Sequence, residues 1–264
     1  MDLDLGGKVA CVTGGSLGIG KAIAETLARE GASVVITSRR RELLEKTAAE
    51  LTERTGGDVV GIASDTTDTA SVRRMVAAAA ERFGRLDILV NGAAAPSGLV
   101  RNTLAEADPD LLLDDLNTKV VGYFRCAQAA AARMREGGYG RIVNIGGLTG
   151  RSSHALSGLR NLAIVHLTKT LSDQLGPAGI TVNTIHPGVV ETEHIHELYE
   201  REARKQGTTA QAVEQGFIDR TPIRRVLAAG EIADLVAFLS SPRAGAITGE
   251  SVGIDGGLTR GIFL

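Results

Sequence analysis

Three glycines near the start of the chain have the spacing of a phosphate-binding loop. Gly14, Gly18 and Gly20 lie between a short apolar run and a segment with helical periodicity. Glycines at such a junction allow a tight turn and let backbone N–H groups approach an anion, which the N-terminal amides and dipole of the following helix then hold. The spacing G-x-x-x-G-x-G also occurs in ordinary strand-to-helix turns, but this context predicts a pyrophosphate site. The residues expected to bind it are Gly14, Ser16, Leu17, Gly18, Ile19 and Gly20.

The residues about 20 positions further on indicate which dinucleotide fits this loop. An NAD site has an acid there that accepts hydrogen bonds from the ribose 2′-hydroxyl, but residues 37–41 read Thr-Ser-Arg-Arg-Arg and include no carboxylate. A guanidinium pairs bidentately with phosphate, so Arg39, with Ser38 and Arg40 beside it, suits the 2′-phosphate of NADP. The alternative is a solvated basic helix start, but a helix N-terminus disfavours arginine, which supports an anionic ligand. The predicted cofactor is therefore NADP(H).

Strand-like and helix-like segments alternate along the chain and predict the fold that carries this loop. Apolar runs rich in β-branched residues occupy positions 9–13, 33–37, 59–63, 86–90, 141–145, 180–186 and 251–254. Segments of helical period separate them, at 19–29, 42–55, 70–83, 109–134, 156–176 and 231–239. Strands that are apolar on both faces and joined by helices form a parallel sheet covered on both sides. We expect a doubly wound α/β (Rossmann) fold of about seven strands, with residues 1–264 as a single domain because no linker-like tract divides the chain.

The composition argues against several classes of partner. The chain has 264 residues with 29 Lys and Arg against 31 Asp and Glu, so a formal net charge of -2 leaves no field to attract nucleic acid or an anionic membrane. The sequence has neither a run of 18 apolar residues nor a basic, apolar leader. Cys11 and Cys126 lie in apolar segments, which indicates buried thiols rather than a disulfide. We expect a cytoplasmic protein that binds neither nucleic acid nor membranes.

A polar stretch after the sixth predicted strand interrupts the regular alternation. Residues 191–221 are helix-competent and follow a strand end, where ligands bind in sheets of this kind, so we expect a substrate lid. Four residues that resemble metal ligands begin this stretch: Glu191, Glu193, His194 and His196. Their spacing is not one of the recognised zinc patterns, and we expect no metal site.

Together with motifs elsewhere, these features resemble the short-chain dehydrogenase/reductase family, near its branch of 3-oxoacyl-acyl-carrier-protein reductases. The resemblance covers nearly the whole chain, including residues 140–145, 248–250 and 255–257. It implies that Asp65, with Thr66 beside it, contacts the adenine. Asn91, Gly92 and Ala93 stand where the family has an Asn-Ala-Gly turn, with the last two residue types exchanged. The loop that the resemblance assigns to the nicotinamide contains Pro187, Gly188 and Thr192.

The same resemblance indicates that the family's catalytic residues are substituted here. The family uses a Ser to polarise the substrate carbonyl, a Tyr to pass the proton, and a Lys four residues later that lowers the pKa of the phenol. Gly147, Ser157 and Asn161 stand at these positions, and no Tyr lies between residues 140 and 170. A Ser hydroxyl is far less acidic than a phenol and Asn carries no charge, so ordinary ketone reduction is expected to lose about 10²–10⁴-fold in rate. Asn117 matches the family's structural and catalytic Asn.

The candidate catalytic residues are accordingly Asn117, Ser157 and Asn161. Three further residues are weighed as substitutes for the missing groups. Histidine titrates near neutrality, so His154 suits an acid, although a plain loop histidine is the favoured interpretation. Arg160 would stabilise an oxyanion, although a solvated or subunit-facing side chain is favoured. Tyr199 would reach a substrate from the lid, although packing within the lid is favoured.

These observations favour an NADP(H)-dependent oxidoreductase with an atypical proton-transfer site, acting on a small molecule with a carbonyl or alcohol group. Two alternatives stay open. The triple substitution favours an NADP(H)-binding pseudoenzyme or regulatory subunit without redox turnover, and a lyase or isomerase on the same scaffold is the other. The family pairs through the helices found here at 117–134 and 157–176, and the alanine-rich run 127–132 permits close approach. The resemblance therefore implies a homo-oligomer, either a tetramer or a dimer.

Overall fold

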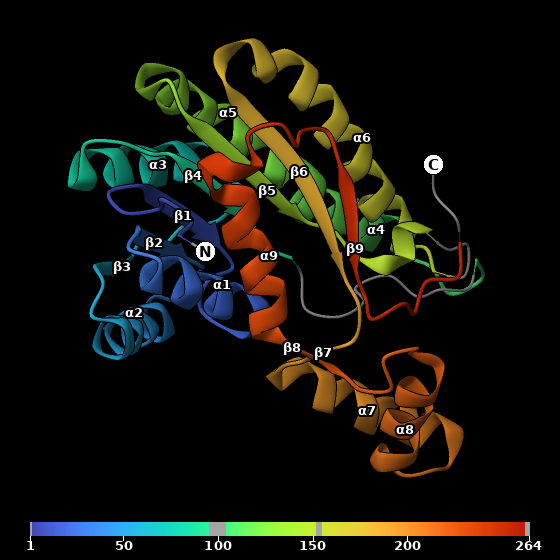
Figure 1. Cartoon of the computed structure of the whole chain (residues 1–264). Coiled ribbons are helices and arrows are strands. Elements are labelled where there is room, and N and C mark those ends of the chain that lie inside the picture. The colour runs from blue at the N-terminus through green and yellow to red at the C-terminus, as the bar shows by residue number, and fades with distance from the viewer. Residues whose placement is uncertain (1, 95–103, 152–154, 262–264) are drawn as a thin grey trace.

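A seven-stranded parallel sheet forms the centre of the molecule (Figure 1). The computed structural model describes residues 2–94, 104–151 and 155–261. The strand order is β3-β2-β1-β4-β5-β6-β9. The strands are β1 (Val9–Thr13), β2 (Ser33–Thr37), β3 (Val59–Gly61), β4 (Ile88–Asn91), β5 (Gly140–Ile145), β6 (Ile180–Pro187) and β9 (Ser251–Ile254). The predicted doubly wound sheet is confirmed, with a third strand that ends two residues earlier than expected.

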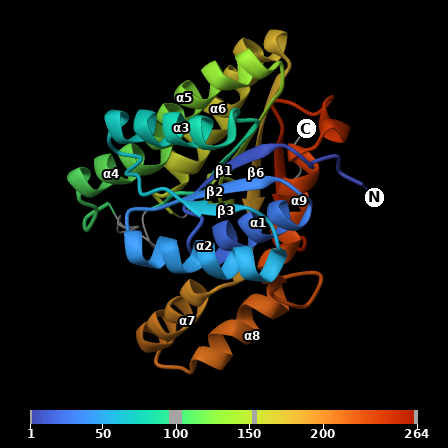
Figure 2. The ribbon, with the colours of Figure 1, turned by 90° about the vertical axis from the view of Figure 1, so that its left-hand side faces the viewer.

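Helices cover both faces of this sheet (Figure 2). One face carries α1 (Gly18–Arg29), α2 (Arg41–Thr55) and α9 (Ala229–Ser240), and the other carries α3 (Thr69–Phe83), α5 (Gly122–Gly137) and α6 (Gly158–Leu175). Successive residues of a strand point to opposite faces, so Ala10 and Val12 of β1 enter the first core and Val9 and Cys11 the second. Both faces are buried, which explains why the strands read as continuous apolar runs. Cys11 and Cys126 are free and buried, as predicted.

The long helix predicted over residues 109–134 is interrupted in the structure. α4 (Pro109–Leu116) is followed by a π-helical turn at Asn117–Val121 and then by α5. The N–H of Gly122 donates to the carbonyl of Asn117, five residues earlier, which is the wider spacing of a π-turn. The turn buries Lys119 and leaves Val121 exposed. Such turns occur frequently at functional sites, and this one places the Lys119 side chain in the interior.

Two helices after β6 form a hairpin that projects from the body of the molecule (Figure 1). These are α7 (Glu193–Gln206) and α8 (Ala210–Arg220), and β7 (Val190–Glu191) pairs in parallel with β8 (Leu227–Ala228) at their base. Tyr199, Ala203 and Val213 are buried together, with Phe217 packed against them, in a cluster separate from the two cores of the sheet. The polar stretch predicted at residues 191–221 is therefore built around a small core of its own. Among the residues that the structure describes, no helix has the length and apolar character needed to cross a membrane.

Candidate functional site

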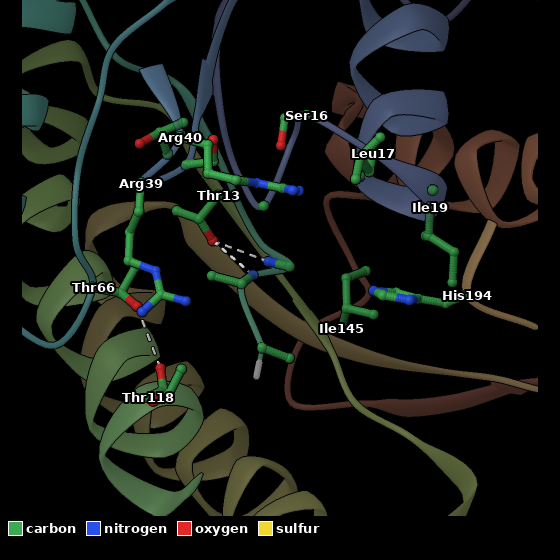
Figure 3. A pocket seen from close by; sticks show the side chains of 18 of the residues that line it. Thr13, Ser16, Leu17, Ile19, Arg39, Arg40, Thr66, Thr118, Ile145 and His194 are labelled. Carbon is green, nitrogen blue, oxygen red and sulfur yellow. Dashed lines mark hydrogen bonds between the residues drawn. The ribbon is translucent and has the colours of Figure 1, made fainter. Parts of the chain in front are cut away.

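A cleft lies at the carboxyl ends of β1, β2 and β4, where ligands bind in doubly wound sheets. Its volume is about 580 Å³, and its walls come from the loop after β1, the ends of β2 and β4, the segment after β3 and the start of α7 (Figure 3). The predicted cofactor residues that line it are Gly14, Ser16, Leu17, Gly18, Ile19, Gly20, Ser38, Arg39, Asp65, Thr66, Gly92, Ala93 and Thr192. Three others, Asn91, Pro187 and Gly188, are not part of its lining.

The loop after β1 is folded so tightly that two of its glycines admit no side chain. A Cβ at Gly20 would lie 2.2 Å from the carbonyl oxygen of Gly14, and a Cβ at Gly14 would lie 2.9 Å from that of Gly92. Gly14 also has a φ of 71°, in the left-handed region that favours glycine. Backbone therefore packs directly on backbone, and the N-terminal amides of α1 stand at the cleft, where they suit an anion.

Thr13 ties this loop to the turn after β4 (Figure 3). Its Oγ1 accepts hydrogen bonds from the N–H of Gly92 at 3.1 Å and from the N–H of Ala93 at 3.2 Å. Beneath the turn, Asn91 Nδ2 donates to Asn144 Oδ1 at 2.9 Å, and both side chains are buried. Asn91 thus joins β4 to β5 under the cleft and supports the turn without lining it.

The end of β2 presents hydroxyl groups without a protein partner. Thr37 Oγ1 and Ser38 Oγ are buried and have no hydrogen-bond partner among the described residues. Arg39 and Arg40 follow directly, and both are exposed and line the cleft (Figure 3). A buried hydroxyl left unbonded costs about 1–3 kcal/mol. A ligand that bonds Ser38 and pairs with a guanidinium therefore fits this corner, as a phosphate does.

Asp65 and Thr66 form the neighbouring wall of the cleft. Asp65 Oδ1 accepts a hydrogen bond from the Thr67 N–H at 2.9 Å and another from the Thr67 hydroxyl at 2.8 Å. The backbone bond, together with the hydroxyl bond and the nearby charge of Arg39, lowers the pKa of Asp65, so this carboxylate is a fixed acceptor. Thr66 Oγ1 donates to the carbonyl of Thr118 at 3.4 Å, which connects this wall to the π-turn (Figure 3).

The start of α7 forms another side of the cleft. Four residues of this region line it: Thr192, Glu193, His194 and Glu197. Behind them, a Cβ at Gly188 would lie 2.7 Å from the Cα of Asp255, so the loop after Pro187 packs closely on the segment after β9. Sequence reasoning identified Thr192 through the resemblance but did not place Glu197 at the cleft, because only the helical repeat of α7 brings it beside His194.

The histidines of this segment form pairs with carboxylates. His196 Nε2 lies 2.8 Å from Glu191 Oε1, and His194 Nδ1 lies 3.3 Å from Glu197 Oε2. All four side chains are largely exposed. Within residues 2–94, 104–151 and 155–261, no three His, Cys, Asp or Glu side chains are grouped in a way that would hold a metal ion.

The residues predicted to stand at the family's catalytic positions meet at the end of β5. Asn161 Nδ2 donates to Thr149 Oγ1 at 2.7 Å, and Ser157 Oγ donates to the same oxygen at 3.5 Å. A Cβ at Gly147 would lie 2.8 Å from Asn161 Nδ2. The Asn161 amide therefore occupies the space beside position 147, and Thr149 brings to the cluster a hydroxyl that sequence reasoning missed.

Lys119 is a second residue that sequence reasoning missed. Its Nζ donates to Asn161 Oδ1 and to the carbonyl of Gly146, both at 2.9 Å, and the residue is 4% exposed. Burial, reinforced by the positive charge of Arg160 and opposed by the carboxylate of Asp115, lowers the pKa of Lys119 to about 7. In the sequence it is a single lysine followed by two valines, on a helical stretch whose other residues are mostly half-buried or exposed. The contact of this lysine with Asn161 depends on the π-turn, which no local sequence pattern predicts.

The charges beside Lys119 belong to an internal ion pair. Arg160 NH1 bonds to Asp115 Oδ1, and the two side chains are 14% and 2% exposed. The interpretation of Arg160 as a solvated side chain is therefore wrong, and the subunit-facing alternative stays a prediction. The physical reason is that a buried carboxylate such as Asp115 requires a charged partner.

The remaining candidates lie elsewhere in the structure. Asn117 Oδ1 accepts a hydrogen bond from Arg125 NH1 at 3.0 Å, so its side chain points away from the cluster around Asn161. Tyr199 is buried inside the hairpin of α7 and α8, in agreement with packing within the lid. His154 lies outside the described residues. The structure thus brings Ser157 and Asn161 together through Thr149 and does not bring Asn117 to them.

Comparison with known proteins matches this geometry to a family. Residues 14–259 match the family described as Enoyl-(Acyl carrier protein) reductase. The chain is 36% identical over 252 residues to the short-chain reductase protein NovJ of Streptomyces niveus, covering 95% of this chain and 93% of that one. It is 34% identical over 256 residues to the 3-oxoacyl-[acyl-carrier-protein] reductase FabG of Escherichia coli, covering 96% and 97%. The chain belongs to the short-chain dehydrogenase/reductase family.

A solved structure of this family extends the match to three dimensions. The L-sorbose reductase of Gluconobacter frateurii, determined with NADPH and L-sorbose, superposes with a TM-score of 0.93 at 30% identity. The match covers 99% of this chain and 100% of the reductase. The resemblance and the fold expected from the sequence are therefore confirmed, and the chain is a short-chain oxidoreductase.

Proposed function

We propose that this short-chain oxidoreductase uses NADP(H) to interconvert a carbonyl and an alcohol through an atypical proton-transfer site. The observation that carries the cofactor assignment is the buried, unpartnered Ser38 hydroxyl beside Arg39 at the end of β2. A 2′-phosphate would bond both groups, whereas a bare ribose hydroxyl would leave the guanidinium unused. The NADPH bound by the L-sorbose reductase of similar fold supports the same assignment.

The residues along the cleft fit the successive parts of this cofactor. The N-terminal amides of α1, reached over Gly14 and Gly18, suit the pyrophosphate. By the family resemblance Asp65 would contact the adenine, and Thr192, with the loop at Pro187 and Gly188, would hold the nicotinamide. When bound, the cofactor supplies or accepts a hydride. The protein's own residues have to bind and orient the substrate and move the accompanying proton.

The proton-transfer site is proposed to consist of Ser157 and Asn161 together with Thr149. In carbonyl reduction the O–H bond of a hydroxyl in this cluster breaks, its proton forms a new O–H bond on the substrate oxygen, and water restores the hydroxyl. The amide of Asn161 donates to Thr149 at 2.7 Å, which stabilises negative charge on that oxygen. For Asn117 we propose a positioning task, because it opens the π-turn that carries Lys119.

The hairpin of α7 and α8 is proposed as the lid over the substrate. Support comes from Glu193, His194 and Glu197, which place the first turns of α7 directly at the cleft. The hairpin has a core of its own, separate from the two cores of the sheet, so it can change position as a unit with little disturbance of the sheet. L-sorbose, the ketose in the structure of the L-sorbose reductase, makes small hydroxylated ketones the first compounds to test.

A homo-oligomer is proposed from the surface of the helices that the sequence singled out. Large apolar side chains are exposed on α4, the π-turn and α5, namely Leu113, Val121 and Phe124, and on α6, namely Leu159 and Leu162. Apolar groups gathered on neighbouring helices are typical of an interface between subunits. Light scattering should give a mass of at least two chains, and a mass of one chain would contradict the proposal.

Two measurements test the redox function itself. Calorimetric titration should show NADPH binding more tightly than NADH. Incubation with a panel of ketones, ketoses, enones and imines should then consume NADPH, followed by the loss of its absorbance. Tight binding of NADPH without consumption by any compound would contradict turnover and favour the pseudoenzyme. Failure to bind either dinucleotide would remove the cofactor assignment as well.

A further inference from the structure

Lys119 is a buried ion that contacts the proposed proton-transfer site. It is 4% exposed, and its Nζ bonds to Asn161 Oδ1 and to the carbonyl of Gly146. Removing an ammonium from water is costly, and an apolar residue of similar length would fill the same space without that cost. A cation retained here therefore points to a task at the group that it holds. That group is the Asn161 amide, which in turn contacts the hydroxyls of Thr149 and Ser157.

We propose that Lys119 is a positioning residue that orients the Asn161 amide and thereby holds the Thr149 and Ser157 hydroxyls in place for proton transfer. The inference rests on the proposed function, because it assigns the control of the same proton-transfer site. An ammonium has three donors and no acceptor, so only the carbonyl end of an amide can face it. Asn161 must then turn its NH₂ toward Thr149, as the structure shows.

Loss of the Lys119 proton would release this constraint. A neutral amine carries a lone pair and can accept a hydrogen bond, so Asn161 could turn its NH₂ toward Lys119 and its oxygen toward Thr149. The Thr149 oxygen would then lose the N–H donor that stabilises negative charge on it. The charge of Lys119 therefore selects between two arrangements of the same three side chains. The arrangement with a donor at Thr149 is the one suited to carbonyl reduction.

Among the described charged and titratable groups that surround Asn161, Lys119 is the one whose pKa lies near neutral pH. Asp115 of α4 and Arg160 of α6 pair with each other. Burial first, and the charge of Arg151 second, lower the pKa of His186 of β6 to about 4, so this ring is neutral at pH 7. Burial raises the pKa of Tyr123 of α5, which is therefore a neutral phenol there. The pKa of Lys119 is lowered to about 7, within the range where its charge can change.

The geometry also predicts that the two interacting residue types can be exchanged. Lys119 comes from the π-turn and Asn161 from α6, and their polar ends meet at 2.9 Å. In the double variant K119N/N161K the ammonium approaches the same place from α6 and the amide from the π-turn. The single variant N161K brings two ammonium groups together, and K119N leaves two amides without a charge. The double variant should therefore have a higher kcat than either single variant. Two residues with independent structural roles would not show this coupling.

The first test needs no substrate. The protein is labelled with ¹⁵N in lysine and asparagine side chains and titrated with NADP⁺ bound. The Nζ signal of Lys119 and the NH₂ signals of Asn161 should move together with one midpoint near pH 7, and the Asn161 movement should be absent in K119M. K119M is included because its apolar side chain has a length similar to that of lysine and preserves packing, whereas K119N leaves a cavity. Asn161 signals that stay constant while Lys119 titrates would overturn the proposal, whether or not the protein turns over NADPH.

The second test uses the NADPH-consuming activity with a substrate from the panel. K119M and K119N should lower kcat by about 10²-fold, a share of the rate that general acid–base groups provide, while binding of NADPH changes little. Wild-type reduction should fall as pH rises through about 7, and this step should vanish in K119M. K119N/N161K should have a higher kcat than either single variant and at least ten-fold that of the poorer one, and K46N, at an exposed lysine of α2, should match the wild type. Unchanged kcat in K119M, or a double variant no better than the singles, would overturn the proposal.

Discussion

The amide of Asn161 occupies the space that a side chain at Gly147 would need. A Cβ at position 147 would lie 2.8 Å from Asn161 Nδ2 and 3.3 Å from its Cγ. Asn161 cannot simply yield, because its amide is held at both ends, by Lys119 at 2.9 Å and by Thr149 at 2.7 Å. The side chain at position 147 and the position of the Asn161 amide are therefore coupled.

This linkage predicts that restoring the family's serine alone is harmful. Gly147→Ser should displace Asn161, break its bonds to Lys119 and Thr149, and lower the free energy of unfolding by about 1–3 kcal/mol, the range for overpacking. Turnover should fall as well. Urea denaturation and kcat measure the two effects.

The matched control is Gly137→Ser near the end of α5. A Cβ there has nothing within 4 Å, so this variant should stay within about 0.5 kcal/mol of the wild type. Equal effects of the two substitutions would show that the tight contact at Gly147 has no consequence.

A second prediction concerns stability against pH. The pKa of Lys119 is lowered from 10.5 in water to about 7 in the folded protein, so between these values the unfolded chain binds more protons than the folded one. The free energy of unfolding contributed by this residue must therefore rise with pH across that window, by at most about 1.4 kcal/mol per pH unit. Below pH 7 both states are protonated and the burial cost is present in full. Above 10.5 neither state carries the proton and the contribution is constant.

Comparison with K119M isolates this contribution. The difference in free energy of unfolding between wild type and K119M, from urea denaturation at several pH values, should shift in favour of the wild type as pH rises from 7 toward 10.5. A difference that is flat over this range would mean that Lys119 is not buried as a titrating amine. K46M serves as the control, because an exposed lysine should leave the difference unchanged with pH.

The cofactor corner gives a third prediction. Arg39→Ala should weaken NADPH binding by about 10–100-fold, because a hydrogen bond to a charged group contributes about 1.5–3 kcal/mol, and should leave NADH binding almost unchanged. Arg41 is the control, since it is exposed at the start of α2, where its guanidinium lies 3.8 Å from the carboxylate of Glu45 at the surface. Arg41→Ala should therefore change neither affinity. Calorimetric titration at fixed ionic strength measures the affinity of the wild type and of each variant for NADPH and for NADH. Equal losses of affinity for NADPH and NADH in Arg39→Ala would contradict a 2′-phosphate site at Arg39.

The parts of this site that could be predicted from sequence are those set by neighbours along the chain. The glycines of the phosphate loop directly follow β1, and Ser38 and Arg39 directly follow β2. Because the two strands are parallel neighbours, their carboxyl ends lie at the same edge of the sheet. Strand positions followed in the same way from apolar runs, because β1 is buried on both faces. These residues line the cleft, as their order along the chain leads one to expect, and their role as cofactor ligands stays a prediction.

The Lys119 contact could not be predicted, for a physical reason. Whether residue 117 or residue 119 faces α6 depends on the phase of the helix, and the π-turn at Asn117–Val121 adds a residue to that phase. A regular 3.6-residue repeat from Pro109 onward gives no hint of the change. Asn117 was therefore chosen by resemblance, whereas the structure turns it to Arg125 and turns Lys119 inward. The partner at position 161 is far along the chain, so no pattern of spacing links the two.

The hairpin supplies the last prediction, through Tyr199. Its hydroxyl is buried without a hydrogen-bond partner among the described residues, and its ring packs against Phe217 with centroids 5.8 Å apart. Removing an unbonded buried hydroxyl removes a desolvation cost, so Tyr199→Phe should leave kcat unchanged and keep or slightly raise stability. Tyr199→Ala empties the centre of the hairpin core and should raise KM, because α7 could no longer hold Glu193 and His194 at the cleft. A loss of kcat in Tyr199→Phe would instead make this phenol the missing proton donor, which its burial in the hairpin argues against.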